Sequence, residues 1–293
     1  MTIKLASKIR FARRLVIMLI WIIMMGFLLR KQVVAQIPAS ILPGESVLPH
    51  NISFRDEWMG IYYNGHKIGY SNTLLQDLSK TNNPLPGFAV SHNTYLAFPV
   101  LGNLRNINLS GNAYLDAQLR PIAFQFNINS GKYNAVLNGK LKGDKISVSI
   151  DSPGEKWREE FEIDKDMMLF SIPNPSLFFK IMKPGEARSL KVFDPITLSS
   201  GSAAIRFIGK DKDYTKRISQ DVYILEVVYQ GVSVKSWIDS NGGILRQESP
   251  LGFLMVKEAK EKARLMPPYR LFENDILGSV SIASNAIIPH PRS

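Results

Sequence analysis

The acidic side chains in WREEFEIDKD, residues 157–166, have a spacing that would fit chemistry. Glu160 and Glu162 are two positions apart, so they would share one face of a β-strand. Two acids facing one cleft are what glycosidases use to protonate and attack a glycosidic bond. Three basic residues alternate with these acids, namely Lys156, Arg158 and Lys165. This mixture of charges favours a solvated strand edge over a catalytic pair.

The four histidines do not form a metal-binding pattern. His50 and His290 stand beside prolines, His66 follows a turn signal, and His92 begins a strand-like run. Zinc sites in sequences of this kind use HExxH or closely spaced His pairs, and neither pattern occurs. The sequence therefore predicts no metal site.

Nucleophile motifs are equally scarce. The chain has no cysteine, which excludes disulfides, a lipidated Cys, thiolate metal sites and a Cys nucleophile. SSGSAA, residues 199–204, lacks the G-x-S-x-G elbow and is interpreted as a turn following Asp194-Pro195. No P-loop or G-x-G-x-x-G sequence is present, and Asp239 is interpreted as an Asx-turn former. We therefore predict a non-enzyme with no catalytic, cofactor-binding or metal-binding residue.

The sequence around these residues predicts a series of β-strands. From residue 57 to about residue 256, β-branched and aromatic residues alternate with polar ones, and turn signals follow at short intervals. The segments with the clearest alternation are residues 92–100, 103–117, 122–128, 145–150, 202–209, 222–229, 232–239 and 243–249. Two short helices are expected, over residues 173–186 and 256–266, each ended by proline.

Three hairpin turns support an antiparallel sheet. Asn64-Gly65 predicts a type I′ turn, and the register of that hairpin places Gly60 directly opposite Gly69. Paired glycines inside strands predict a sharp bend of the sheet or an aromatic ring across the gap, with close approach of a ligand as the alternative. Gly143-Asp144 or Asn138-Gly139 forms the second turn, and Ser240–Gly243 forms the third. We predict a single curled antiparallel sheet, an open half-barrel.

The N-terminal segment predicts export from the cytoplasm. Leu15–Leu29 has no charged side chain, and as a helix it would extend about 22 Å at ~1.5 Å per residue. That length fits a signal anchor whose flanking bases extend it, or the core of a cleaved signal peptide ending near Val33-Val34-Ala35. A buried core helix is the third alternative.

Charge gives the orientation of that segment. Seven of the 36 Lys and Arg residues lie in residues 1–31, and the first acid is Glu45. Without this segment, 29 basic residues face 25 acidic ones, so the charge excess does not indicate nucleic-acid binding. We expect a single-pass protein of the cytoplasmic (inner) membrane with its N-terminus in the cytoplasm and residues 36–293 outside.

From these segments we expect four regions along the chain. They are a signal anchor or signal peptide (1–35), a Pro-containing linker (36–55), an antiparallel β domain (56–266) and a C-terminal tail (267–293).

Three stretches occur in the order found in a known family. They are EWMGIYYNGHKIGY (57–70), FDPITLSS (193–200) and SWIDSNGGILRQESPLGFLMVKEAKEKA (236–263). They resemble the N-terminal β domain of bacterial membrane-associated transglutaminase-like proteins, over roughly residues 56–266. In that family a papain-like domain with a Cys-His-Asp triad follows. No residue here matches the Cys, so the resemblance implies the β domain without catalysis.

Two functions are expected. The first is a non-catalytic, membrane-tethered module that binds a protein partner or substrate outside the cytoplasmic membrane. Its expected partner is a separately encoded transglutaminase-like or transport protein. The alternative is a lipid or lipoprotein carrier that uses the concave face of the half-barrel, which is similar to the half-barrels of lipoprotein carriers.

Overall fold

The structure is a computed structural model that describes most of the predicted β domain. The described residues are 40–41, 55–81, 87–100, 103–131, 133–164, 167–169, 182–250 and 252–267. Within them no helix is long and apolar enough to cross a membrane. The predicted segment Leu15–Leu29 and the tail from residue 268 onward lie outside these ranges.

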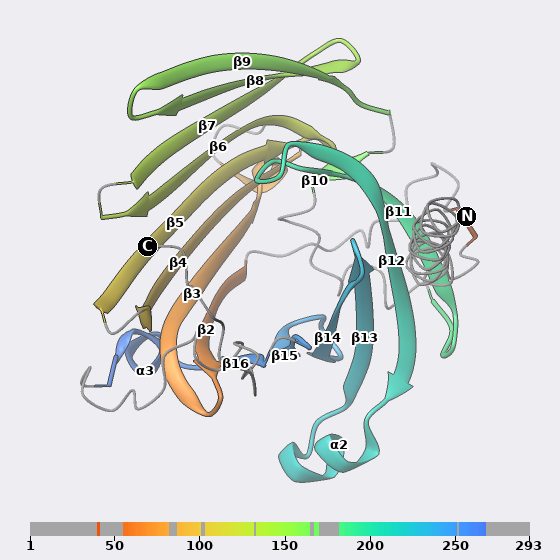
Figure 1. The fold of residues 1–293 in the computed structure, drawn as a ribbon. Helices are drawn as coiled ribbons and strands as arrows, with labels where there is room; N and C mark the ends of the chain where they lie inside the picture. The colour runs from red at the N-terminus through yellow and green to blue at the C-terminus, as the bar shows by residue number, and fades with distance from the viewer. Residues whose placement is uncertain are drawn as a thin grey trace, which may run out of the picture.

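The described chain is mainly β, with one large sheet and two short α-helices (Figure 1). The strands are β1 (Ser40–Ile41), β2 (Arg55–Tyr63), β3 (His66–Asp77), β4 (Phe88–Val100), β5 (Asn103–Leu115), β6 (Pro121–Ser130), β7 (Tyr133–Lys142), β8 (Lys145–Ser152), β9 (Glu155–Glu162), β10 (Met168–Leu169), β11 (Ala187–Asp194), β12 (Ser199–Lys210), β13 (Val222–Tyr229), β14 (Val232–Asp239), β15 (Ile244–Glu248) and β16 (Phe253–Lys257). The helices are the 3₁₀ turn η1 (Leu78–Lys80), α2 (Lys212–Ile218) and α3 (Lys260–Arg264).

The sheet is a curled meander, which confirms the expected fold class of the β domain. Its strand order is β1-β11-β12-β13-β14-β15-β16-β2-β3-β4-β5-β6-β7-β8-β9, and β10 also pairs with β11. Every pairing is antiparallel except those of the two-residue strands β1 and β10. Strands β2–β9 form one broad curved wall, β11–β14 form the facing wall, and β15 and β16 connect them (Figure 1). The short strand β1 lies inside the segment predicted as a linker.

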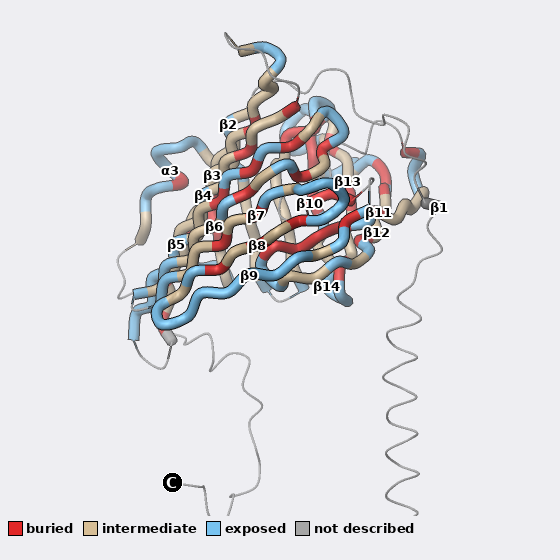
Figure 2. The backbone as a smooth tube through the Cα atoms, turned by 90° about the horizontal axis from the view of Figure 1, so that it is seen from above, coloured by how far each residue is buried: buried red, intermediate tan, exposed pale blue. Residues whose placement is uncertain are grey.

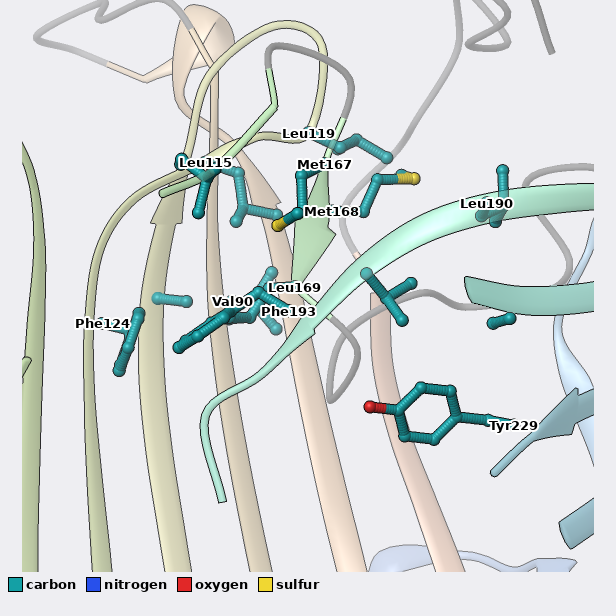
Figure 3. Close-up of a cluster of buried hydrophobic side chains, with 14 of the residues drawn as sticks. Val90, Leu115, Leu119, Phe124, Met167, Met168, Leu169, Leu190, Phe193 and Tyr229 are labelled. Carbon is teal, nitrogen blue, oxygen red and sulfur yellow. The ribbon is translucent and has the colours of Figure 1, made fainter. Parts of the chain in front are cut away.

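The core fills the space between the two walls. Phe193 of β11 has no exposed surface, and its ring centroid lies 6.2 Å from that of Phe124 on β6 and 5.3 Å from that of Phe161 on β9. Figure 3 shows this cluster of buried side chains, with Phe124 of β6 and Phe193 of β11 labelled. We call the sheet face that carries this cluster the inner face and the opposite face the outer face. Buried and exposed residues alternate along the strands accordingly (Figure 2).

The first hairpin has the predicted turn but not the predicted register. Asn64 and Gly65 both have positive φ, as a type I′ turn requires. A bulge after Ile61 shifts the pairing, so Gly60 faces Tyr70 and Gly69 faces Ile61. The prediction that the glycines face each other was therefore wrong, because the extra residue of a bulge changes every later pair.

Gly60 and Gly69 are each required to be glycine for a different steric reason. A Cβ on Gly60 would collide with the carboxylate of Glu258, and one on Gly69 would collide with the backbone carbonyl of Tyr95. Gly60 thus leaves room on the outer face for the chain that follows β16, and Gly69 allows close approach of β4 at the bulge.

The structure decides between the two alternatives for the second turn and confirms the third. Gly143-Asp144 forms the turn between β7 and β8, with positive φ at Gly143, whereas Asn138-Gly139 lies within β7. The turn between β14 and β15 is closed by the bond from the Asp239 N–H to the Gly243 carbonyl, as predicted.

The helices differ from the prediction in three ways. Helix α2 was not predicted, and α3 covers only five residues because β16 continues to Lys257. Most of the predicted helix over residues 173–186 lies outside the described ranges, and residues 182–186 carry no helix. SSGSAA, interpreted as a turn, is instead the start of β12, and the turn lies just before it.

Candidate functional site

The outer face of β4–β7 carries an unusual set of side chains. Positions that alternate with the buried residues Val90, Ala113, Phe124 and Leu137 point outward there. Most of these outward positions hold Asn, Gln or Ser. We call the set the amide face: Ser91, Asn93, Asn106, Asn108, Ser110, Asn112, Gln125, Asn127, Asn129, Asn134 and Asn138.

Strand pairing arranges these residues in rows. One row places Tyr95, Asn108, Asn129 and Asn134 directly opposite one another on β4, β5, β6 and β7. A second row consists of Ser91, Asn112, Gln125 and Asn138, and two hydrogen bonds join residues within it. The Ser91 hydroxyl donates to Asn112 Oδ1 at 2.8 Å, and Gln125 Nε2 donates to Asn138 Oδ1 at 2.8 Å. Within the described contacts, the side-chain amides of Asn93, Asn108, Asn129 and Asn134 have no hydrogen-bond partner.

The amide face carries no formal charge. The outward positions of residues 70–76, 89–97, 104–114, 123–129 and 134–138 contain no Lys, Arg, Asp or Glu, although 21% of the chain is charged. Asn, which holds most of these positions, is also a poor strand former. Residues that lower strand stability without packing gain are expected where function requires them. The face is therefore our candidate functional site.

Aromatic rings continue the row at one end. The rings of Trp58 on β2, Tyr70 on β3 and Tyr95 on β4 lie in series, with centroids 6.1 Å and 5.6 Å apart. The Lys260 ammonium lies 5.5 Å from the Trp58 ring centroid, so α3 borders this end of the face. The indole N–H of Trp58 is buried and has no hydrogen-bond partner among the described residues.

Replacing the two central amides should stabilise the protein. We expect the double variant Asn108→Thr/Asn129→Thr to raise the free energy of unfolding by about 0.5–1 kcal/mol, because threonine suits an exposed strand better than asparagine. Urea unfolding of the purified chain measures this change. The matched control is Gln118→Ala in the β5–β6 turn, which should leave stability within about 0.5 kcal/mol. A loss of stability in the double variant would mean that these amides support the sheet.

A second polar group lies on the inner face. The His92 ring is placed between two hydroxyls, with Nδ1 2.7 Å from Thr73 Oγ1 and Nε2 2.8 Å from Thr94 Oγ1. Hydroxyls either donate or accept, so a neutral imidazole is fully satisfied there. Burial lowers the pKa of His92 below its ordinary value of 6.5. The ring thus ties β3 to β4 as a neutral group.

Acidification should therefore cost stability through His92. The unfolded chain gains a proton near pH 6.5, while the folded protein resists it, so stability falls as the pH drops below 6.5. The contribution is at most about 1.4 kcal/mol per pH unit. Urea unfolding at pH 7 and pH 5 would show this fall, and His92→Gln should reduce it. An equal fall in both proteins would assign the effect to other groups.

The other residues considered in the sequence are placed as follows. Glu160 and Glu162 lie exposed on the same face of β9, the last strand in the sheet order, which confirms the solvated edge. His66 is exposed at the start of β3, and His50 and His290 lie outside the described ranges. Asp239 Oδ1 accepts from the N–H groups of Asn241 and Gly243, which confirms the Asx turn. In the described part of the chain, no group of three His, Asp or Glu could hold a metal ion.

Sequence reasoning did not find the amide face. The asparagines at alternating positions of NLRNINLSGN and FQFNINS were visible, but only strand register shows that they meet on one face.

Comparison with known proteins gives a distant likeness of fold. No protein-family model and no curated protein matches the chain. A β-barrel-like protein of the domain of unknown function DUF1849 from Brucella abortus is 12% identical with a TM-score of 0.48, over 70% of this chain and 97% of that one. A DUF1089 family protein from Pseudomonas aeruginosa is 14% identical with a TM-score of 0.36, over 61% of this chain and 89% of that one. At these values neither likeness carries an argument about function, which rests on the residues of this chain.

Proposed function

We propose that this protein is a non-catalytic binding module held outside the cytoplasmic membrane by Leu15–Leu29. The observation that carries the proposal is the amide face. It spans strands β4–β7 and lies on the side of the sheet away from the core. Its members Asn93, Asn108, Asn129 and Asn134 offer side-chain amides that have no hydrogen-bond partner among the described residues. A face of this kind fits recognition of a partner or substrate.

The tether and the partner rest on the sequence. The basic flanks of Leu15–Leu29 support an uncleaved anchor with residues 36–293 outside the membrane. The resemblance to the N-terminal β domain of transglutaminase-like proteins supports a separately encoded transglutaminase-like or transport protein as the protein partner. On this proposal the module positions a substrate while another chain performs the chemistry.

Site-specific crosslinking in intact cells tests the proposal. A photoreactive residue at Asn108 should give a crosslinked product larger than the chain itself, whereas one at the exposed Lys212 of α2 should not. The intact mass of the protein from gently solubilised membranes should show that residues 1–35 are retained. If Asn108 and Lys212 both give only the free chain, the face does not bind a partner or substrate.

The carrier function is supported by a separate observation. Four apolar side chains point inward on β4 and β5 but are not part of the core cluster: Leu96, Phe98, Ile107 and Leu109. They are half-buried, and an acyl chain would be a fitting ligand for such a surface. Native mass spectrometry should then find a bound lipid that Ile107→Lys removes. Protein that carries no lipid from membranes would dismiss this function.

A further inference from the structure

We infer that the ligand of the amide face is an uncharged polysaccharide, lying along the row Tyr95, Asn108, Asn129 and Asn134. This inference rests on the proposed function and specifies its substrate class.

The lack of charged side chains on the amide face argues against charged ligands. Nucleic acids and acidic polymers are held by Lys and Arg, and the outward positions of β4–β7 carry neither between residues 89–97, 104–114, 123–129 and 134–138. Basic ligands would require Asp or Glu, which are also missing from these positions. The best match for a neutral polar face is a neutral polar ligand.

The amides match a ligand rich in hydroxyls. Each Asn or Gln side chain offers two N–H donors and one carbonyl acceptor, so it can bind two adjacent hydroxyls of one sugar ring at once. Asn108, Asn129 and Asn134 have no internal partner among the described residues, so their donors and acceptors are available to such a ligand. Protein–protein contacts, in contrast, depend on buried aromatic, Met and Arg anchors that the centre of this face lacks.

The row also has the length that a polymer needs. Adjacent strands are about 4.8 Å apart, so successive side chains of the row repeat at that distance across the sheet. This spacing is close to the length of one hexose unit. An extended polysaccharide lying across the strands would therefore contact one residue of the row with each sugar. Tyr95 at the end of the row and Tyr70 beyond it offer ring surfaces that suit the C–H faces of sugars.

The test is isothermal titration calorimetry, which measures the binding of neutral oligosaccharides to the full-length protein. The protein is kept in a detergent whose headgroup contains no sugar. The probes are cellohexaose, maltohexaose and the fully N-acetylated chitohexaose, and the anionic control is a hyaluronan hexasaccharide. We expect at least one neutral probe to bind and the anionic control not to bind. Asn108→Thr/Asn129→Thr should weaken binding by about fivefold to a hundredfold, since two lost hydrogen bonds contribute about 0.5–1.5 kcal/mol each and ~1.4 kcal/mol is tenfold. Gln118→Ala should bind as the parent does.

The design separates the possible outcomes. The double variant is expected to unfold at higher denaturant, so weaker binding by it cannot result from misfolding and would support the inference. Binding that is unchanged in the double variant would overturn the assignment to this face. If no neutral probe binds at millimolar concentration while Asn108 crosslinks to a protein, the polysaccharide is wrong and the binding module stands. If Asn108 crosslinks to nothing and no probe binds, both proposals fail.

Discussion

Truncation of Phe193 to alanine is expected to lower the free energy of unfolding by about 3–5 kcal/mol. Phe193 is fully buried at the point where β11 meets the opposite wall, and its ring contacts those of Phe124 and Phe161. No strand-to-strand hydrogen bonds join β11 to β6 or β9, so side-chain packing holds the two walls together there. The cavity left by the ring would remove contacts from both walls.

Urea unfolding of Phe193→Ala and Phe193→Leu measures this effect. Leucine keeps much of the apolar volume and should cost less than alanine. Ile196→Ala is the matched control, because Ile196 lies nearby on the same chain segment but is 54% exposed, and it should change stability by less than about 0.5 kcal/mol. If Phe193→Ala is tolerated as well as Ile196→Ala, the walls are held together elsewhere.

Glu258→Ala is the second substitution that we expect to lower the free energy of unfolding strongly. The Glu258 side chain is 2% exposed on the outer face, where Lys67 Nζ lies 2.7 Å from Oε2 and the Tyr62 hydroxyl donates to Oε1 at 2.7 Å. Removing the carboxylate leaves Lys67, whose side chain is only 10% exposed, without an anionic partner, and its ammonium keeps only the hydrogen bond to the Lys262 carbonyl. Breaking a buried pair in this way costs about 3–5 kcal/mol. Hydrogen exchange of residues 258–267 should show release of α3 from β2 and β3.

One control variant and the pH dependence of stability separate this effect from loss of surface charge. Lys262→Ala removes the exposed partner of the same carboxylate and should cost less than about 1 kcal/mol. Burial raises the pKa of Glu258, but hydrogen bonds from Lys67 and Tyr62 outweigh it, so the folded pKa lies below the ordinary 4.5. The stabilisation should therefore be complete above pH 4.5 and be lost as the pH falls through the folded value. A Glu258→Ala protein as stable as Lys262→Ala would show that α3 docks without this pair.

The sequence predicts the strands better than the helices. Residues 222–229 and 232–239 coincide with β13 and β14, because alternation of apolar and polar residues is a local signal. Helix α2 has no such signal, since none of its residues is buried. It forms because Asp211 caps its first turn while accepting a hydrogen bond from Trp237 on β14. A contact with a strand far along the chain cannot be read from seven residues.

The candidate site was missed for the same physical reason. The asparagines of β5 and β6 were visible, but the register that aligns Asn108 with Asn129 depends on the whole hairpin. The bulge after Ile61 shows how one extra residue moves every later pair, as it did for Gly60 and Gly69. His92 likewise gains its role from Thr73 on the neighbouring strand.

The pairing of β16 with β2 has a consequence for how the protein is made. β2 is the first long strand of the domain and β16 the last, yet Met59 and Lys257 are direct neighbours in the sheet. Strands β2–β9 can form one hairpin after another as they emerge, but β2 keeps an open edge until nearly the whole domain has been synthesised. The late-arriving C-terminal strands thus complete the fold, so chains truncated before β16 would present a template for aggregation.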